Sequence, residues 1–271
     1  MTTVYFDVKY GEHENSYVDI CFPENNEKNM GLIFYVHGGG FIAGDKGCHT
    51  ADIRRCAENG YISASTNYRY VSENVNCFDV MEDLTASLKK VREFVAEKGI
   101  DIEKMLIVGS SAGAHLALLY AYSMADKAPI KPMAAVSYCG STDVANTDMI
   151  LDTHLDKPEK MVRLFSNLSN FEIDLNDFDT AIPALKKVSP LYYVNENTVP
   201  TVLIHGAKDG CVPPKNAQKL DAKLEESGIE HKYIILPNSD HGLGNDPECM
   251  EEAFRTLIEY ADKYVKKGEN L

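Results

Sequence analysis

The stretch MLIVGSSAGAHLALL, residues 105–119, decides how this chain folds. It begins with a short apolar run, typical of strands that are buried on both faces of a parallel sheet. Two serines between Gly109 and Gly113 follow, and then an Ala- and Leu-rich segment that predicts a buried helix. A strand that runs through Gly-x-Ser-x-Gly into a helix makes a sharp turn with the central serine exposed. We therefore expect Ser111 to be a nucleophile and Ser110 to be only its neighbour.

Similar apolar runs recur along the chain and alternate with helical patterns. The predicted strands cover residues 31–36, 61–66, 105–109, 133–138, 201–206 and 232–237. Apolar residues at helical spacing predict helices over residues 79–99, 112–125, 215–228 and 248–267. This alternation predicts one α/β domain over residues 1–271, with a mostly parallel central sheet and helices on both of its faces.

Two parts of the chain depart from this alternation. Residues 3–10 and 16–22 alternate apolar and polar side chains around a turn-like EHENS segment, which predicts antiparallel strands at one edge of the sheet. Residues 141–188 are too long for a tight connection and carry helical patterns. Long ordered insertions are often lids, so we expect a small, partly helical lid above the sheet.

Composition and charge narrow the classes of function. The 271 residues carry a formal charge of −14, which repels phosphate backbones and argues against a nucleic-acid partner. No apolar run reaches the ~18–20 residues that span a bilayer, so we expect no membrane partner. The seven cysteines form no CxxC pair and no HExxH motif occurs, so we expect no metal site. Reduced cysteines and the lack of a signal-peptide pattern predict a cytoplasmic location.

A serine nucleophile needs a base, and the base needs a carboxylate that orients it. His241 follows the last predicted strand, in the loop NSDHGLG, and Asp209 follows the strand before it. Loops at the carboxyl ends of parallel strands are where α/β sheets place their sites. Asp240 is a rival acid, but adjacent side chains usually diverge, so we expect Asp209 to pair with His241.

The remaining histidines fit structural roles better than catalytic ones. His37 begins a glycine-rich loop, where hydrogen bonds within the loop are expected. His115 lies on the helix after Ser111, and His205 ends a buried strand. His49 lies in a loop or helix context and has no matching partner in the sequence pattern.

The segment FYVHGGGFIAGD, residues 34–45, supplies a second element of the predicted site. Three glycines directly after a strand let backbone N–H groups approach a ligand closely. Such fixed donors stabilise the oxyanion of a tetrahedral intermediate, and we expect them to be Gly39, Gly40 and Ala112. Side chains near these motifs are expected to line the substrate pocket: Phe41, Cys211 and Val212.

With these motifs in this order, the chain resembles α/β-hydrolases of the HGGG esterase group, which includes acetyl esterases, feruloyl esterases and kynurenine formamidases. The resemblance runs from HGGGF through NYRY (67–70), GSSAG and HGAKDGCVP to DHG. It implies the α/β-hydrolase fold, a Ser–His–Asp triad and no cofactor. Many relatives carry an aspartate where this chain has Ser110, and NYRY stands where one group has DYRLAPE.

These observations predict a serine hydrolase that cleaves short-chain, acetyl-type esters of small alcohols or sugars through an acyl-enzyme. An amide hydrolase similar to an arylformamidase would carry the same triad and remains an alternative. A ligand-binding homologue without activity is a second alternative, and the complete triad argues against it. The expected partner is a small-molecule ester. The sequence leaves open whether the chain forms homo-oligomers.

Overall fold

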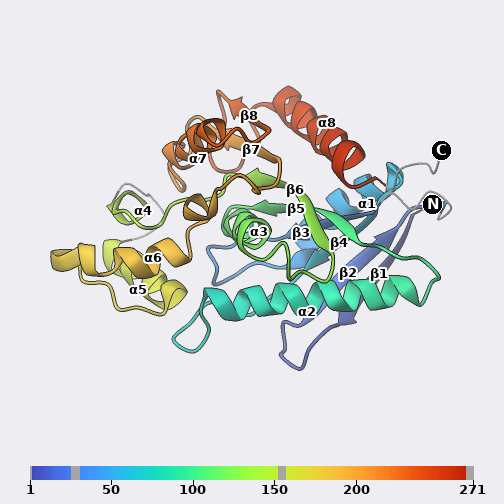
Figure 1. Ribbon diagram of the computed structural model, residues 1–271, viewed down its shortest axis with the longest axis horizontal. Helices are drawn as coiled ribbons and strands as arrows, with labels where there is room; N and C mark the ends of the chain where they lie inside the picture. Colours follow the sequence, from blue (N-terminus) through green and yellow to red (C-terminus); the bar gives the residue numbers. More distant parts are fainter. Residues whose placement is uncertain (1, 26–30, 152–156, 267–271) are drawn as a thin grey trace.

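The computed structural model describes residues 2–25, 31–151 and 157–266, and its strands form one sheet in that part of the chain (Figure 1). The strand order is β1-β2-β4-β3-β5-β6-β7-β8. Pairing from β4 to β8 is parallel, while β2 pairs antiparallel with both β1 and β4. This confirms the predicted parallel sheet with an antiparallel edge. The strands are β1 (Thr3–Lys9), β2 (Tyr17–Phe22), β3 (Leu32–Val36), β4 (Ile62–Thr66), β5 (Lys104–Ser110), β6 (Lys131–Tyr138), β7 (Thr201–Gly206) and β8 (His231–Leu236).

Helices cover both faces of the sheet because side chains alternate between the two faces along each strand. Leu32, Phe34 and Val36 of β3 join the core under α2, α3 and α7. Ile33 and Tyr35 join the opposite core, which packs against α1 and α8. The helices are α1 (Thr50–Glu58), α2 (Cys77–Ala96), α3 (Ala112–Ser123), α7 (Lys215–Glu226) and α8 (Pro247–Tyr264). Sequence patterning predicted all of them except α1, whose nine residues give a short signal.

The segment over residues 141–188 is partly helical, as expected. It contains α4 (Asp148–Leu151), α5 (Pro158–Ser169), the 3₁₀ helix η2 (Leu175–Thr180) and α6 (Ile182–Lys187). Its helices lie together at one end of the molecule, to the left in Figure 1. Residues 152–156 of the predicted lid and Lys267 of the predicted last helix lie outside the described residues. Among the described residues, no helix combines the length and the apolar character needed to span a bilayer.

The turn between β5 and α3 depends on two glycines. A Cβ at Gly109 would lie 2.2 Å from the carbonyl oxygen of Gly113. A Cβ at Gly113 would lie 2.1 Å from the carbonyl oxygen of Val36 and 2.3 Å from that of His37. All three distances are too short for any side chain, so the backbones of β3, β5 and α3 are in direct contact around this turn. The turn therefore requires glycine at both positions.

We expect Gly113→Ala to lower the free energy of unfolding by about 1–3 kcal/mol, because the methyl group forces α3 away from β3. Urea denaturation measures the change. The matched control is Gly244→Ala, where a Cβ meets nothing within 4 Å, and we expect a change within about 0.5 kcal/mol. Equal stability of the two variants would contradict the close contact.

Candidate active site

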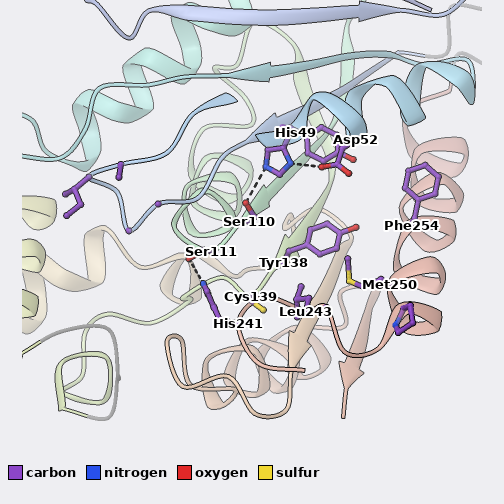
Figure 2. Close-up of a pocket in the computed structure, with 18 of the residues that line it drawn as sticks. His49, Asp52, Ser110, Ser111, Tyr138, Cys139, His241, Leu243, Met250 and Phe254 are labelled. Carbon is purple, nitrogen blue, oxygen red and sulfur yellow. Dashed lines mark hydrogen bonds and ion pairs between the residues drawn. The ribbon is translucent and has the colours of Figure 1, made fainter. Parts of the chain in front are cut away.

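The ends of β5, β7 and β8 bring three predicted site residues together. The Nε2 atom of His241 lies 2.9 Å from the Oγ atom of Ser111 (Figure 2). Its Nδ1 atom lies 2.8 Å from Oδ2 of Asp209. These residues are separated by up to 130 positions in the chain. They meet because the carboxyl ends of neighbouring parallel strands share one edge of the sheet. The result is a continuous hydrogen-bonded chain from a hydroxyl through an imidazole to a carboxylate.

The backbone of Ser111 adopts an unusual conformation that presents its side chain. Its φ of 53° and ψ of −119° lie in a region that L-residues rarely adopt. The Ser111 N–H donates to the Tyr138 carbonyl at 2.7 Å, and the Ser111 carbonyl accepts from the N–H groups of Ala114 and His115. Local strain held by several surrounding bonds is typical of functional positions. The expected sharp turn is therefore present at Ser111.

Asp209 is buried, and four hydrogen-bond donors face its carboxylate. Its Oδ1 atom accepts from the N–H groups of Cys211 at 2.8 Å and Val212 at 2.9 Å. Its Oδ2 atom contacts His241 and lies 3.2 Å from Nε2 of His205. Burial alone raises the pKa of Asp209, but the hydrogen bonds from His205, His241 and the Val212 amide outweigh it and hold the pKa well below its usual range. The carboxylate is therefore ionised over the whole physiological pH range.

The glycine loop after β3 has the backbone freedom that the sequence predicts. Gly39 and Gly40 have φ values of 117° and 60°, which glycine adopts without strain. Both residues line the same cavity as Ser111. Ala112 is the first residue of α3, directly after Ser111, and the first N–H groups of a helix have no partner within the helix. The loop and the helix start thus flank Ser111 with backbone groups.

The NYRY segment holds this loop in place, a role that the sequence did not reveal. The Tyr68 hydroxyl donates to the His37 carbonyl at 2.8 Å, and its ring stacks on the His37 ring at 4.3 Å. Asn67 donates to Asp45 at 2.9 Å and accepts from the Lys46 N–H at 2.6 Å. His37 is buried and its Nδ1 atom lies 2.7 Å from the Gly38 carbonyl, so its structural placement agrees with the expectation.

A cavity of about 1190 Å³ opens above the hydrogen-bonded chain. Its walls come from the glycine loop, from α1, from α5 and from α8 with the loop before it. The three pocket residues expected from the sequence are not among the residues that line it. Phe41 is 4% exposed and packs edge-on against His115 in the core. Cys211 and Val212 instead turn their N–H groups to Asp209 and support that carboxylate.

Ser110 and His49 also face this cavity, and together with Asp52 they form a second hydrogen-bonded chain (Figure 2). The expectation that His49 has no matching partner is wrong. Asp52 lies three residues later, and one turn of helix brings the two side chains together. The His-x-x-Asp spacing was a sequence signal for this pair. The contact with Ser110, 61 residues away, required the fold.

One group of side chains in the described residues has the composition of a metal site. A ligand atom from each of Cys139, Asp209 and His241 lies within 4.8 Å of the others. Burial raises the pKa of the Cys139 thiol well above its usual range, and a thiol binds metals as the thiolate. His241 and Asp209 are also bonded to each other. This donor set suits proton transfer better than metal coordination.

Comparison with known proteins gives the family context of this site. A sequence model of the BD-FAE family matches residues 18–224. Esterase LipQ of Mycobacterium tuberculosis is 31% identical over 202 residues, which cover 70% of this chain and 44% of LipQ. A probable isoprenylcysteine alpha-carbonyl methylesterase of Oryza sativa is 25% identical over 86% of this chain and 56% of its own length. The chain thus spans about half the length of the curated relatives it matches.

Solved structures show the same fold. A truncated carbohydrate esterase from gut microbiota superimposes with a TM-score of 0.78 at 20% identity, covering 96% of each chain. The butyrate-bound esterase Est2 of Thermogutta terrifontis superimposes with a TM-score of 0.71 at 21% identity, covering 97% of this chain and 96% of Est2. The expected α/β-hydrolase fold is confirmed.

We expect Asp209→Asn to lower the free energy of unfolding at pH 7 by about 1–3 kcal/mol, because it removes a buried, hydrogen-bonded charge. The pKa of Asp209 is lower in the folded chain than in the unfolded chain. The contribution of the ionised Asp209 to the free energy of unfolding is therefore complete above about pH 4 and is lost as the pH falls below that value. Urea denaturation from pH 7 to pH 3.5 should show that the free energies of unfolding of wild type and Asp209→Asn become more similar as the pH falls.

The control for this measurement is Asp240→Asn, an exposed neighbour whose Oδ1 atom accepts only from the nearby Gly242 N–H among the bonds described. We expect a change within about 0.5 kcal/mol at each pH. A gap between wild type and Asp209→Asn that stays constant down to pH 3.5 would contradict the lowered pKa.

Proposed function

Because the chain belongs to the BD-FAE family, we propose that it is a serine esterase that hydrolyses carboxylic esters through an acyl-enzyme. One observation carries the proposal: the hydrogen-bonded chain from Ser111 through His241 to Asp209 at the carboxyl edge of the sheet. Two of its three members lie in loops at strand ends and the third on a sharp turn. This is the arrangement that activates a serine for attack on a carbonyl carbon.

The reaction follows from the roles of these three groups. His241 takes the proton of Ser111 as the Oγ atom attacks the ester carbonyl. Asp209 keeps the Nδ1 proton directed at itself and stabilises the imidazolium that forms. His241 then gives the proton to the leaving alcohol, which leaves an acyl group on Ser111. A water molecule, deprotonated by His241, releases the acid and restores the hydroxyl.

Backbone N–H groups stabilise the negative charge that develops on the carbonyl oxygen. We assign this role to Gly39, Gly40 and Ala112. The positive φ of both glycines and the position of Ala112 at the start of α3 support the assignment. Fixed dipoles of this kind need no reorganisation during the reaction, and loss of one donor costs about 10²–10³ in turnover in comparable sites.

We infer that the substrate is a short-chain acyl ester of a small alcohol or a sugar. Est2 binds butyrate, and another structural neighbour is a carbohydrate esterase. The cavity of about 1190 Å³ is slightly larger than the usual range for small-molecule sites, which ends at about 1,000 Å³. An acetyl group fills only a small part of it, so the remaining volume suits an alcohol group of the size of a sugar.

We expect Ser111→Ala to reduce kcat for p-nitrophenyl acetate by at least about 10⁴-fold, because the nucleophile is lost while the donors remain. Release of p-nitrophenol measures turnover. Ser227→Ala, at the end of α7, is the control and should retain wild-type activity. Wild-type protein that is folded yet inert on p-nitrophenyl acetate, butyrate and octanoate would overturn the proposal in favour of amide substrates or ligand binding without catalysis.

The predicted lid contributes to the cavity through α5. Lys160, Met161 and Leu164 of this helix line it. In Figure 1, α5 lies on the other side of α3 from α1 and α8. We propose that α5 forms the roof over the alcohol group and thereby affects which esters are accepted.

We expect Leu164→Trp to lower kcat/KM for 4-methylumbelliferyl acetate about tenfold relative to p-nitrophenyl acetate. The larger side chain fills space in the cavity. This hinders binding of the bulkier methylumbelliferyl group more than binding of the nitrophenyl group. The control is Leu175→Trp in the same segment, because Leu175 is exposed and does not line the cavity. An unchanged ratio in Leu164→Trp would show that α5 does not contact the alcohol.

A further inference from the structure

The second hydrogen-bonded chain, Ser110–His49–Asp52, has no role in the proposed reaction although it borders the same cavity. The Nδ1 atom of His49 lies 2.8 Å from Oδ2 of Asp52, and its Nε2 atom lies 3.3 Å from Oγ of Ser110. The three residues come from β5, from the 3₁₀ helix η1 (Lys46–His49) and from α1. A serine, a histidine and an aspartate that are joined by hydrogen bonds at a cavity wall are a candidate for a second function at this site.

Ser110 is unsuited to be a second nucleophile. It is the last residue of β5, in register with Tyr138 of β6, and its φ is not positive. Burial alone lowers the pKa of His49, but the hydrogen bonds with Asp52 and Cys48 outweigh it and raise the pKa to about 9. At neutral pH the imidazole is therefore protonated and cannot accept a proton from Ser110. It donates Nε2–H to the Ser110 oxygen, which leaves the Ser110 hydroxyl proton free to point elsewhere.

The charged groups near Ser110 are paired with one another. Asp52 accepts from His49, and Glu251 of α8 accepts from Arg55 at 2.6 Å. Arg55 also lies over the Phe254 ring at 3.5 Å from its centroid. Two tyrosines, Tyr35 and Tyr138, complete this part of the wall. Paired charges and aromatic rings favour a neutral substrate group over an anion. The Ser110 hydroxyl, at the inner end of this part of the wall, can donate a hydrogen bond to such a group.

The two adjacent serines direct their hydrogen bonds to different sides. In Figure 2 the bond from Ser111 leads to His241, while the bond from Ser110 leads away from it to His49. His241 must protonate the leaving alcohol, so the alcohol lies on the His241 side of Ser111. With the oxyanion at the assigned N–H groups of Gly39, Gly40 and Ala112, the side left for the acyl group is the one toward Ser110.

We propose that Ser110 is a specificity-determining residue whose hydroxyl donates a hydrogen bond to an ether or hydroxyl oxygen in the acyl group of a neutral ester. His49 and Asp52 are positioning residues that orient this hydroxyl. The proposal rests on ester hydrolysis at Ser111. It narrows the substrate class to esters of oxygen-bearing short acids, such as alkoxy- or hydroxyacids.

Because His49 orients the Ser110 hydroxyl, the preference for acyl groups that carry an oxygen should depend on pH. Above about pH 9, neutral His49 keeps its proton on the Nδ1 side facing Asp52, and its Nε2 atom accepts from Ser110. The hydroxyl proton is then withdrawn from the substrate. The titratable or charged groups around His49 come from β3 with its following loop, from η1, from α1 and from β6: Tyr35, His37, Cys48, Asp52, Arg55 and Tyr138.

The test compares p-nitrophenyl methoxyacetate with p-nitrophenyl butyrate. The two acyl chains have the same length, and the methoxyacetate has an ether oxygen where the butyrate has a methylene group. The readout is the ratio of their kcat/KM values in each variant relative to wild type, because this comparison cancels the intrinsic reactivity of the two esters. We expect Ser110→Ala to lower the ratio about 3- to 10-fold, the value of one hydrogen bond. Ser110→Thr, which keeps the hydroxyl, should keep the ratio within about twofold.

The positioning residues are tested by the pH profile of the same ratio. In wild type the ratio should fall as the pH rises through about 9. Asp52→Asn removes the carboxylate that raises the pKa of His49, so the fall should begin at lower pH. The Asp52 side chain is 48% exposed, and this variant should fold even if Ser110→Ala does not. Ser227→Ala should reproduce the wild-type profile.

Each outcome decides the matter. Equal loss of activity on both esters in Ser110→Ala, or a wild-type ratio that is flat with pH, would overturn the proposal and leave Ser110 as a packing residue. A second pair of esters, 2-methoxyethyl acetate and butyl acetate, carries the oxygen in the alcohol instead of the acyl group. If Ser110→Ala lowers the kcat/KM ratio of this pair and leaves the ratio of methoxyacetate to butyrate unchanged, Ser110 contacts the alcohol, and the assignment to the acyl group is overturned. Wild type inert on all four esters would instead overturn the proposed function, and the inference with it.

Discussion

The contact between the start of α3 and the end of β3, at Gly113, is the constraint on which the site depends. It brings the backbones of β3, β5 and α3 within van der Waals distance. The turn at Ser111 is consequently so sharp that its φ becomes positive, and its side chain points out of the sheet. The same approach places the glycine loop beside Ser111, since that loop begins where β3 ends. The exposed position of Ser111 and the placement of the glycine loop beside it therefore both depend on one close packing contact.

Two carboxylates, the buried Asp209 and the half-exposed Asp52, determine the electrostatics of the two histidines at the cavity. Asp209 keeps its charge because two N–H groups and two histidines replace the water that burial removes. Asp52, at the other wall, raises the pKa of His49. Two imidazoles close to adjacent serines thus have different surroundings. His241 is part-buried at the cavity, bonded to a carboxylate that is itself saturated with donors, whereas His49 is held as a cation by a carboxylate that remains half exposed.

Local sequence signals predicted most of the strands and helices and the three central site residues. Ser111 was identifiable because its motif stands between a buried strand and a helix, and His241 and Asp209 because each follows a parallel strand. The pocket side chains could not be predicted in this way. Phe41 is adjacent to the glycines in sequence, but its positive φ of 69° turns it into the core against His115. Cys211 and Val212 serve Asp209 through their backbones, which no side-chain pattern reveals.

The sequence by itself determined the α/β alternation, the sharp turn and the identity of the Ser–His–Asp residues, because each depends on periodicity or on motifs within a few residues. Only the tertiary structure decided the cavity and the second chain through Ser110. The His49–Asp52 pair is local, but its contact with Ser110 exists because β3 and β5 are neighbours in the sheet. The cavity walls from α1, α5 and α8 meet through packing on that sheet. Contacts between residues far apart in the chain depend on which elements become neighbours, and the folded sheet specifies this.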